Sequence, residues 1–186
     1  MKDLLKGVNL YLIGMMGCGK TTVGQILAQH LGYRFADTDA LIEKIAGKSI
    51  SEIFAQEGEE AFRELESQVL AEVSTYKNLS VATGGGIVLR RFNWSYLQHG
   101  IVVWLDVPVE QLSDRLRNDT SRPLLANTDP KAKLQTLLEQ RKPLYAQADI
   151  RVTVTADETP EQVAARVIKE INKILKPEIR AVNCQI

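Results

Sequence analysis

The residues best suited to chemistry form one glycine-rich stretch near the start of the chain. Gly14, four further residues, Gly19, Lys20 and Thr21 match the P-loop pattern G-x-x-x-x-G-K-[ST]. An apolar run at residues 8–13 precedes the pattern and a helix-like run follows it. Glycines let consecutive N–H groups turn inward, and the start of a helix adds its positive end. A glycine-rich turn without a ligand is the alternative, but the number of matching features favours a nucleoside triphosphate site.

The chemistry of this loop follows from its side chains. Lys20 would reach the β- and γ-phosphates, and the hydroxyl group of Thr21 would ligate Mg²⁺. Cys18 lies inside the loop, where it is either a thiolate-prone residue near a helix N-terminus or a small filler. The residues expected to surround the nucleotide phosphates are Gly14, Gly17, Cys18, Gly19, Lys20, Thr21 and Thr22.

Two carboxylates follow the second predicted strand. Asp37 and Asp39 are two positions apart, and alternate side chains of an extended segment share a face. One could hold Mg²⁺ through its water shell, and the other could accept a hydrogen bond from a substrate hydroxyl. The alternative is that one of them is the N-cap of a helix from Ala40. Beside a P-loop, we expect a functional role for at least one.

Three consecutive glycines, Gly84, Gly85 and Gly86, come directly after another predicted strand. Three adjacent glycines lose much chain entropy on folding, so an ordinary loop is a poor use of them. We interpret them as a loop that a substrate approaches closely, with a tight turn as the alternative.

A polar segment at residues 118–129 joins two predicted helices and is long enough to be a mobile lid. Arg122 within it could close over the transferred phosphate and offset negative charge. An ordinary surface arginine is an equally good interpretation of that position alone, and Arg141 is uninformative by itself. Arg63 and Glu66, three residues apart, indicate a charge pair on a solvated helix face.

The elements that must position these residues alternate along the chain, which favours a three-layer α/β/α domain with a parallel sheet. Ligands of such sheets bind at the carboxyl ends of the strands, so the P-loop, the segment at Asp37–Asp39 and the loop at Gly84–Gly86 are expected around one crevice. Predicted strands cover residues 8–13, 34–36, 80–82, 101–105 and 151–155, and predicted helices cover 20–31, 38–46, 50–56, 59–76, 109–118, 130–148 and 160–175. The pattern ends at Pro177, so residues 177–186 are expected to be a loose extension.

The composition excludes several classes of protein. The 186 residues suit one domain, and 23 basic against 23 acidic residues give no global field for nucleic acid or an anionic membrane. Two cysteines, Cys18 and Cys184, make neither a disulfide framework nor a metal quartet. No N-terminal apolar stretch is long enough for a signal or a membrane span. We therefore expect a cytoplasmic protein, although a plastid form without its transit peptide would look the same.

Taken together, these motifs resemble the shikimate kinase family, of the nucleoside monophosphate kinase branch of P-loop proteins. The matching pieces are residues 14–22, 37–39, 49–54, 58–66, 84–86, 122–125 and 141–145, in the order and spacing of the family. The resemblance implies a five-stranded parallel sheet in order 2-3-1-4-5. It also implies a single domain at residues 1–176, with a substrate-binding segment at about 38–65, a lid at about 118–129, and a tail at 177–186.

The resemblance further implies a role for each matching position. Asp39 would bind the substrate hydroxyls, Arg63 and Arg141 the shikimate carboxylate, and Gly85 would donate its N–H to the substrate. Paired guanidinium groups suit a planar carboxylate better than lysines do. Thr21 would ligate Mg²⁺, with Asp37 assisting through water. The other implied contacts are Arg122 on the phosphates, Arg115 on adenine, and Phe54, Phe62, Glu66, Gly84 and Gly86 around the substrate.

The implied activity is Mg²⁺-dependent transfer of the γ-phosphoryl group of ATP to the 3-hydroxyl of shikimate, in chorismate and aromatic amino acid biosynthesis. Lys20, Asp39 and Arg122 would be catalytic, and the protein would be a monomer without nucleic-acid or membrane partners. Residues 156–160 lack an arginine that some relatives place against adenine, so the resemblance says less about the base than about the phosphates. The alternatives are a gluconate or nucleoside monophosphate kinase of the same branch, and a regulatory nucleotide-binding module that no longer catalyses.

Overall fold

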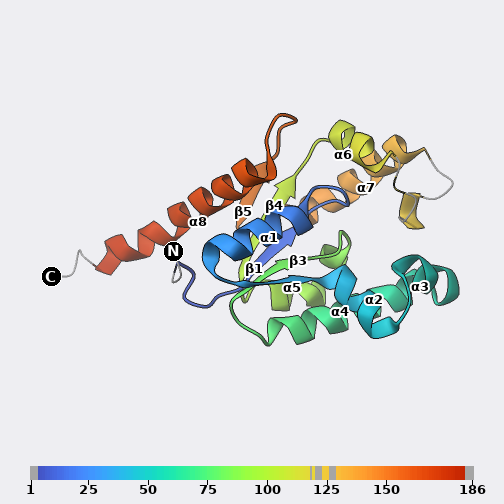
Figure 1. Ribbon diagram of the computed structural model, residues 1–186, viewed down its shortest axis with the longest axis horizontal. Coiled ribbons are helices and arrows are strands. Elements are labelled where there is room, and N and C mark those ends of the chain that lie inside the picture. Colours follow the sequence, from blue (N-terminus) through green and yellow to red (C-terminus); the bar gives the residue numbers. More distant parts are fainter. Residues whose placement is uncertain (1–3, 118, 120–122, 126–128, 183–186) are drawn as a thin grey trace.

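The computed structural model describes residues 4–117, 119, 123–125 and 129–182. Its five strands form one parallel sheet in the order β2-β3-β1-β4-β5, which confirms the predicted fold class and strand order (Figure 1). The strands are β1 Leu10–Ile13, β2 Arg34–Asp37, β3 Leu79–Ala82, β4 Ile101–Asp106 and β5 Ile150–Thr153.

The strand that leads into the P-loop is the central one. β1 pairs with β3 on one side and with β4 on the other, and all four of its residues are buried. A strand that is covered on both faces has no solvated side, which explains its continuous apolar sequence. The P-loop is therefore anchored at the middle of the sheet.

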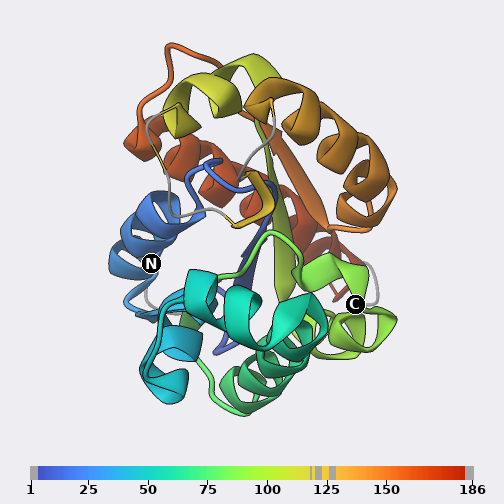
Figure 2. The same cartoon turned by 90° about the vertical axis from the view of Figure 1, so that its right-hand side faces the viewer.

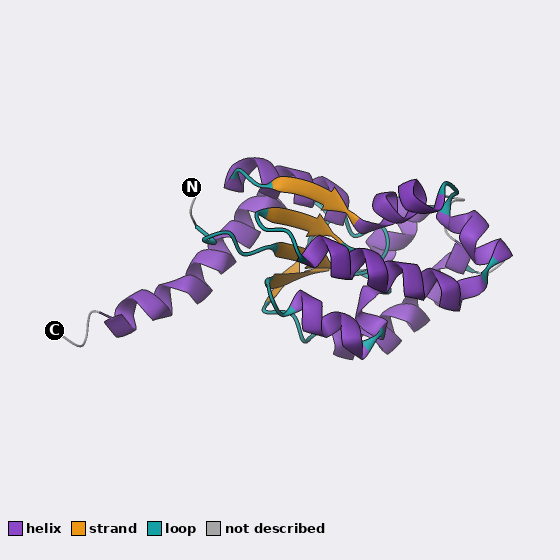
Figure 3. Cartoon of the chain, turned by 90° about the horizontal axis from the view of Figure 1, so that it is seen from below, coloured by secondary structure: helices purple, strands orange, loops and turns teal. Residues whose placement is uncertain are grey.

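Helices cover both faces of the sheet. Figure 3 shows helices on both sides of the strands; among them α1 and α8 pack against each other, and α4, α5 and α7 each contact η1. The helices are α1 Lys20–Leu31, α2 Thr38–Ala46, α3 Ile50–Gln56, α4 Gly58–Ser74, α5 Arg91–Leu97, α6 Val109–Leu116, α7 Pro130–Tyr145 and α8 Pro160–Val182, with 3₁₀ turns η1 Ile87–Leu89 and η2 Pro123–Leu125. None of the helices that the structure describes has the length and apolar character that a membrane span requires.

Two groups of elements extend beyond the carboxyl ends of the strands. The pair α2 and α3 forms one, and α6 with the start of α7 forms the other (Figure 1). η2 contacts both α3 and α7, and Figure 2 shows it in front of the ends of the strands. Local sequence fixes the start of α3, since Ser49 and Glu52 make a complete capping box there. The carboxyl edge of the sheet is thus enclosed from two sides.

The predicted bounds of α1, α2 and α3 are those of the structure, and the other predicted ends differ by a few residues. The helix α5 was missed because its aromatic seven-residue sequence is too short to show a helical period. The expectation that the helical pattern ends at Pro177 is wrong, because α8 continues to Val182. A proline removes one backbone donor without preventing the following turns, and Pro143 likewise lies inside α7. Cys184 lies outside the described residues.

Candidate active site

A cleft of about 520 Å³ opens at the carboxyl ends of β1, β2 and β3. Such a position is where ligands bind in open α/β sheets. Seven separate stretches of the chain line it: Met16, Gly17 and Gly19–Thr22; Asp37, Asp39, Ala40 and Glu43; Ser49–Ser51 and Phe54; Phe62, Arg63 and Glu66; Thr83–Gly86; Leu124; and Arg141. Every stretch that the sequence motifs singled out, apart from Arg122, therefore contributes to one space or to its border. Arg122 lies outside the described residues.

The P-loop backbone has the conformation of an anion cradle. Gly14 and Gly19 have φ angles of 142° and 94°, which side chains rarely allow. At Gly14 a Cβ atom would also lie only 2.6 Å from the carbonyl oxygen of Leu105. Gly19 is the N-cap of α1 and, as a glycine, has no side chain with which to cap the N–H groups of this helix. These donors and the positive end of the helix are available to a phosphate.

Lys20 is held over this loop by backbone oxygens. Its Nζ donates hydrogen bonds of 2.9 Å to the carbonyl groups of both Gly14 and Met15. The ammonium group also lies 3.6 Å from Sγ of Cys18, which is only 2% exposed. Cys18 therefore fills the inside of the loop, in agreement with the filler interpretation. The phosphates of a bound nucleotide would therefore take the place of these carbonyl groups as partners of the Lys20 ammonium group.

Asp37 makes two different connections with its two carboxylate oxygens. Oδ2 accepts a 2.7 Å hydrogen bond from the hydroxyl group of Thr21. Oδ1 accepts from the backbone N–H groups of Asp39 at 3.0 Å and Ala40 at 3.4 Å, which makes Asp37 the N-cap of α2. The N-cap interpretation is therefore confirmed, and it leaves the second oxygen in contact with the P-loop, while the metal role of Asp37 stays a prediction.

Oxygen ligands for a hard cation are present at this point. Thr21 and Asp37 place a hydroxyl and a carboxylate oxygen beside the phosphate cradle. Mg²⁺ is commonly bound by one or two such groups together with substrate phosphates and water, so this donor set fits it. The described residues hold no cluster of three or more His, Cys, Asp or Glu side chains that could bind a metal ion.

The three glycines after β3 leave room for neighbouring charged groups. A Cβ atom on Gly84 would lie 2.3 Å from Oε1 of Glu66 and 2.8 Å from Oδ1 of Asp39. One on Gly86 would lie 2.2 Å from Nη1 of Arg63. At Gly85 a Cβ atom would meet only ordinary contacts, at 3.4 Å or more. The outer two glycines are therefore required by the protein itself, whereas the middle one is not.

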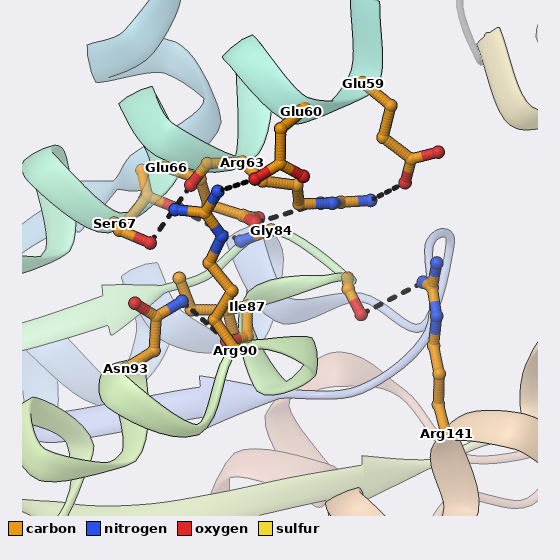
Figure 4. A network of polar contacts seen from close by, with 12 residues as sticks. Glu59, Glu60, Arg63, Glu66, Ser67, Gly84, Ile87, Arg90, Asn93 and Arg141 are labelled. Atoms are coloured by element: carbon orange, nitrogen blue, oxygen red, sulfur yellow. Dashed lines mark hydrogen bonds and ion pairs between the residues drawn. The ribbon is translucent and has the colours of Figure 1, made fainter.

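Arg63 and Glu66 form a buried ion pair on α4, and the expectation of a solvated helix face is wrong for both. Their side chains are 7% and 1% exposed, and Nη1 of Arg63 lies 2.9 Å from Oε2 of Glu66. The loop at Gly86 covers them, which sequence spacing alone does not reveal (Figure 4). Nη2 of Arg63 also binds Oε1 of the half-exposed Glu59 at 2.9 Å.

Burial and charge act in opposite directions on this pair. Burial raises the pKa of Glu66, and the nearby Arg63 only partly offsets it. Burial alone would lower the pKa of Arg63, but the negative charges of Glu66 and Glu59 outweigh burial and raise the pKa above its usual value. Among the described residues, neither Oε1 of Glu66 nor Nε of Arg63 has a hydrogen-bond partner. The pair therefore offers one hydrogen-bond donor and one acceptor at the wall of the cleft.

Arg141 reaches the same loop from the opposite side. It lies on α7, is 3% exposed, and its Nη1 donates a 3.1 Å hydrogen bond to the carbonyl oxygen of Gly85 (Figure 4). Tyr145, one turn further along α7, donates to the same oxygen at 2.6 Å. Sequence reasoning missed Tyr145, although its spacing of four residues from Arg141 places both on one helix face.

Other predicted residues lie at the border of the cleft. Phe54 and Phe62 line it with ring centroids 4.8 Å apart. Arg115 donates from Nη1 to the carbonyl oxygen of Gly17 at 3.2 Å, which places it against the P-loop. The arrangement as a whole sets a triphosphate cradle beside a pocket that has two guanidinium groups, several carboxylates and an aromatic wall. Such a pocket can receive a small acceptor that carries both hydroxyl groups and a carboxylate.

Comparisons with known proteins agree on one family. A sequence model described as shikimate kinase matches residues 16–172. A shikimate kinase of Trichormus variabilis is 64% identical over 176 residues, which cover 95% of this chain and 97% of that protein. One of Nostoc punctiforme is 60% identical over 178 residues, or 96% and 98% of the two chains.

Solved structures show the same relationship. Shikimate kinase from Acinetobacter baumannii in complex with shikimate has a TM-score of 0.89 and 41% identity, and the match covers 92% of this chain and 97% of that one. A gluconokinase from Sinorhizobium meliloti has a TM-score of 0.60 at 15% identity, over 94% and 97% of the two chains. The second likeness concerns the fold alone.

Proposed function

The chain belongs to the shikimate kinase family, and we propose that its cleft transfers the γ-phosphoryl group of ATP to the 3-hydroxyl of shikimate. The observation that carries the proposal is the pair Arg63 and Arg141, whose guanidinium groups flank Gly85 and Gly86 beside the P-loop. Two guanidinium groups recognise a planar carboxylate with good geometry. The relative from Acinetobacter baumannii is described as a complex with shikimate, a small polyhydroxylated carboxylate.

The transfer depends mainly on positioning and on charge. The loose transition state of phosphoryl transfer needs little covalent help, so holding donor and acceptor in line supplies most of the rate. Lys20 would move from the carbonyl groups of Gly14 and Met15 to the β- and γ-phosphates and offset their charge. Asp39 would orient the 3-hydroxyl group by accepting its hydrogen bond, and would act as the general base that receives its proton.

Thr21 and Asp37 would hold Mg²⁺, the hydroxyl directly and the carboxylate through water. When bound, this ion would neutralise charge on the β- and γ-phosphates. We further propose that Arg122 in the lid at 118–129 contacts the phosphates, that Arg115 lies on adenine, and that residues 38–65 bind the acceptor. The monomeric state, the cytoplasmic location and the single domain at 1–176 remain predictions.

A panel of acceptors tests the proposal. Purified protein is incubated with ATP, Mg²⁺ and either shikimate, gluconate or AMP, and the product is identified by mass spectrometry and ³¹P NMR. We expect phosphorylation of shikimate alone, at its 3-hydroxyl. Efficient phosphorylation of gluconate or AMP without that of shikimate would favour another kinase of this branch. No transfer to any acceptor, with ATP bound, would favour a regulatory module.

A further inference from the structure

The hydroxyl group of Tyr145 lies where the two halves of the cleft meet. It donates to the carbonyl oxygen of Gly85 at 2.6 Å and lies 3.7 Å from Sδ of Met15 in the P-loop. Gly85 is itself next to the P-loop, since a Cβ atom there would be 3.4 Å from the backbone nitrogen of Met16. One buried hydroxyl therefore contacts both the nucleotide side and the acceptor side.

Among the residues that the structure describes, the carbonyl oxygen of Gly85 has two donors, and one of them is Arg141. Arg141 approaches at 3.1 Å through Nη1, so the guanidinium group is partly engaged by the protein. If Arg141 turns toward a substrate carboxylate, this hydrogen bond weakens or is lost. A partly buried carbonyl group that loses its donor costs free energy, and this cost would weaken substrate binding. The second donor removes the cost.

We propose, on the basis of the function above, that Tyr145 is a positioning residue for the acceptor. Its hydroxyl group holds the carbonyl oxygen of Gly85 while Arg141 binds the substrate carboxylate. The loop at Gly84–Gly86 thereby keeps its distance from the P-loop, and with it the acceptor keeps its distance from the γ-phosphate.

The surroundings of Tyr145 suit this role. Its ring stacks on Trp104 of β4 with centroids 5.8 Å apart and an interplanar angle of 27°, and the residue has no exposed surface. The hydroxyl group is therefore fixed by packing and does not depend on the loop for its position. Burial raises the pKa of Tyr145 far above its usual value, so the hydroxyl remains a donor at any working pH.

The variant Tyr145→Phe tests the proposal because it keeps the ring and removes only the hydroxyl. We expect the KM for shikimate to rise about tenfold, because the partly buried carbonyl group of Gly85 loses a donor, while the Kd for ADP stays within about twofold. The matched control is Tyr11→Phe. Tyr11 on β1 is equally buried, at 1% exposed, and its hydroxyl accepts a hydrogen bond from Asn9, outside the residues that line the cleft. The control should change neither constant.

A double variant separates positioning from stability. In an Arg141→Lys background no guanidinium group leaves the carbonyl oxygen of Gly85 when shikimate binds. Tyr145→Phe should therefore raise the shikimate KM by less than about a third of its effect in the wild-type background. Equal effects in both backgrounds, or a lower Tm with an unchanged shikimate KM, would overturn the role of Tyr145 and leave the proposed function intact. Wild-type protein that does not phosphorylate shikimate would remove both.

Discussion

The hydroxyl group of Thr21 and the carboxylate of Asp37 are joined by a 2.7 Å hydrogen bond, and the same carboxylate caps α2 with its other oxygen. The P-loop and the helix that carries Asp39 thus share one side chain. A change at Thr21 can therefore reach the start of α2 through a single side chain.

Asp37→Asn should separate the two tasks of this residue. Asparagine caps a helix as well as aspartate does, so the free energy of unfolding should stay within about 0.5 kcal/mol of the wild type. The loss of the negative charge should raise the half-saturating Mg²⁺ concentration by about tenfold or more. Urea unfolding and a Mg²⁺ titration of the activity measure the two effects.

Two further variants complete that test. Asp37→Ala loses the cap as well, which should cost about 0.5–2 kcal/mol of stability. Asp149→Asn is the control, since this carboxylate accepts from the N–H group of Val102 at the opposite edge of the sheet. An unchanged Mg²⁺ requirement in Asp37→Asn would contradict a metal role for Asp37.

The three glycines after β3 should differ when each is replaced by alanine. Gly85→Ala meets only ordinary contacts in the protein, so its Tm should match the wild type while the KM for shikimate rises at least tenfold. Gly86→Ala places its Cβ atom 2.2 Å from Arg63 and should lower the Tm as well. Thermal unfolding and steady-state kinetics distinguish them. A Gly85→Ala protein with normal shikimate kinetics would argue against an acceptor at this loop.

Arg63→Lys keeps the charge and removes the planar fork, so we expect the KM for shikimate to rise at least about tenfold. Arg90→Lys is the matched control. Arg90 also binds two carboxylates of α4, Glu60 and Glu64, but both are more than half exposed and neither lines the cleft (Figure 4). A similar rise of the KM in both variants would mean that loss of ion pairs on α4, and not of a carboxylate site, is responsible.

Arg63→Ala is a less informative variant than Arg63→Lys. It would leave the carboxylate of Glu66 buried without its partner, which typically costs about 3–5 kcal/mol. Calorimetry should therefore show a clear loss of stability together with weakened shikimate binding.

The raised pKa of Glu66 predicts a pH dependence of stability. Burial makes the folded state hold this proton more tightly than the unfolded state does. Stability from this group is therefore fully present at low pH and falls as the pH rises through the folded pKa. Glu66→Gln removes the titration, so the stability of the wild type minus that of the variant should decrease as the pH rises above the ordinary pKa of a glutamate, 4.5. Chemical unfolding across this range measures it, and a difference that grows with pH would contradict the prediction.

Much of the molecule could be predicted from local pattern. The P-loop, the alternation of strands and helices and the N-cap at Asp37 depend on residues close in sequence, and the strand order came from the resemblance. The burial of Arg63 and Glu66 could not be predicted, because it depends on the loop at Gly86 folding over α4. Tyr145 was missed for a similar reason, since its partners Gly85 and Met15 are 60 and 130 residues away.

The central claim is that the P-loop and the arginine-lined pocket form one two-substrate site. A coupled assay of ADP release, with ATP and Mg²⁺ and with or without shikimate, tests it most directly. We predict that shikimate raises the rate of ADP release by several orders of magnitude. In folded Lys20→Ala the shikimate-dependent rate should be lower by a factor of about 10²–10³. Equal ADP release with and without shikimate, or normal turnover of folded Lys20→Ala, would contradict the account.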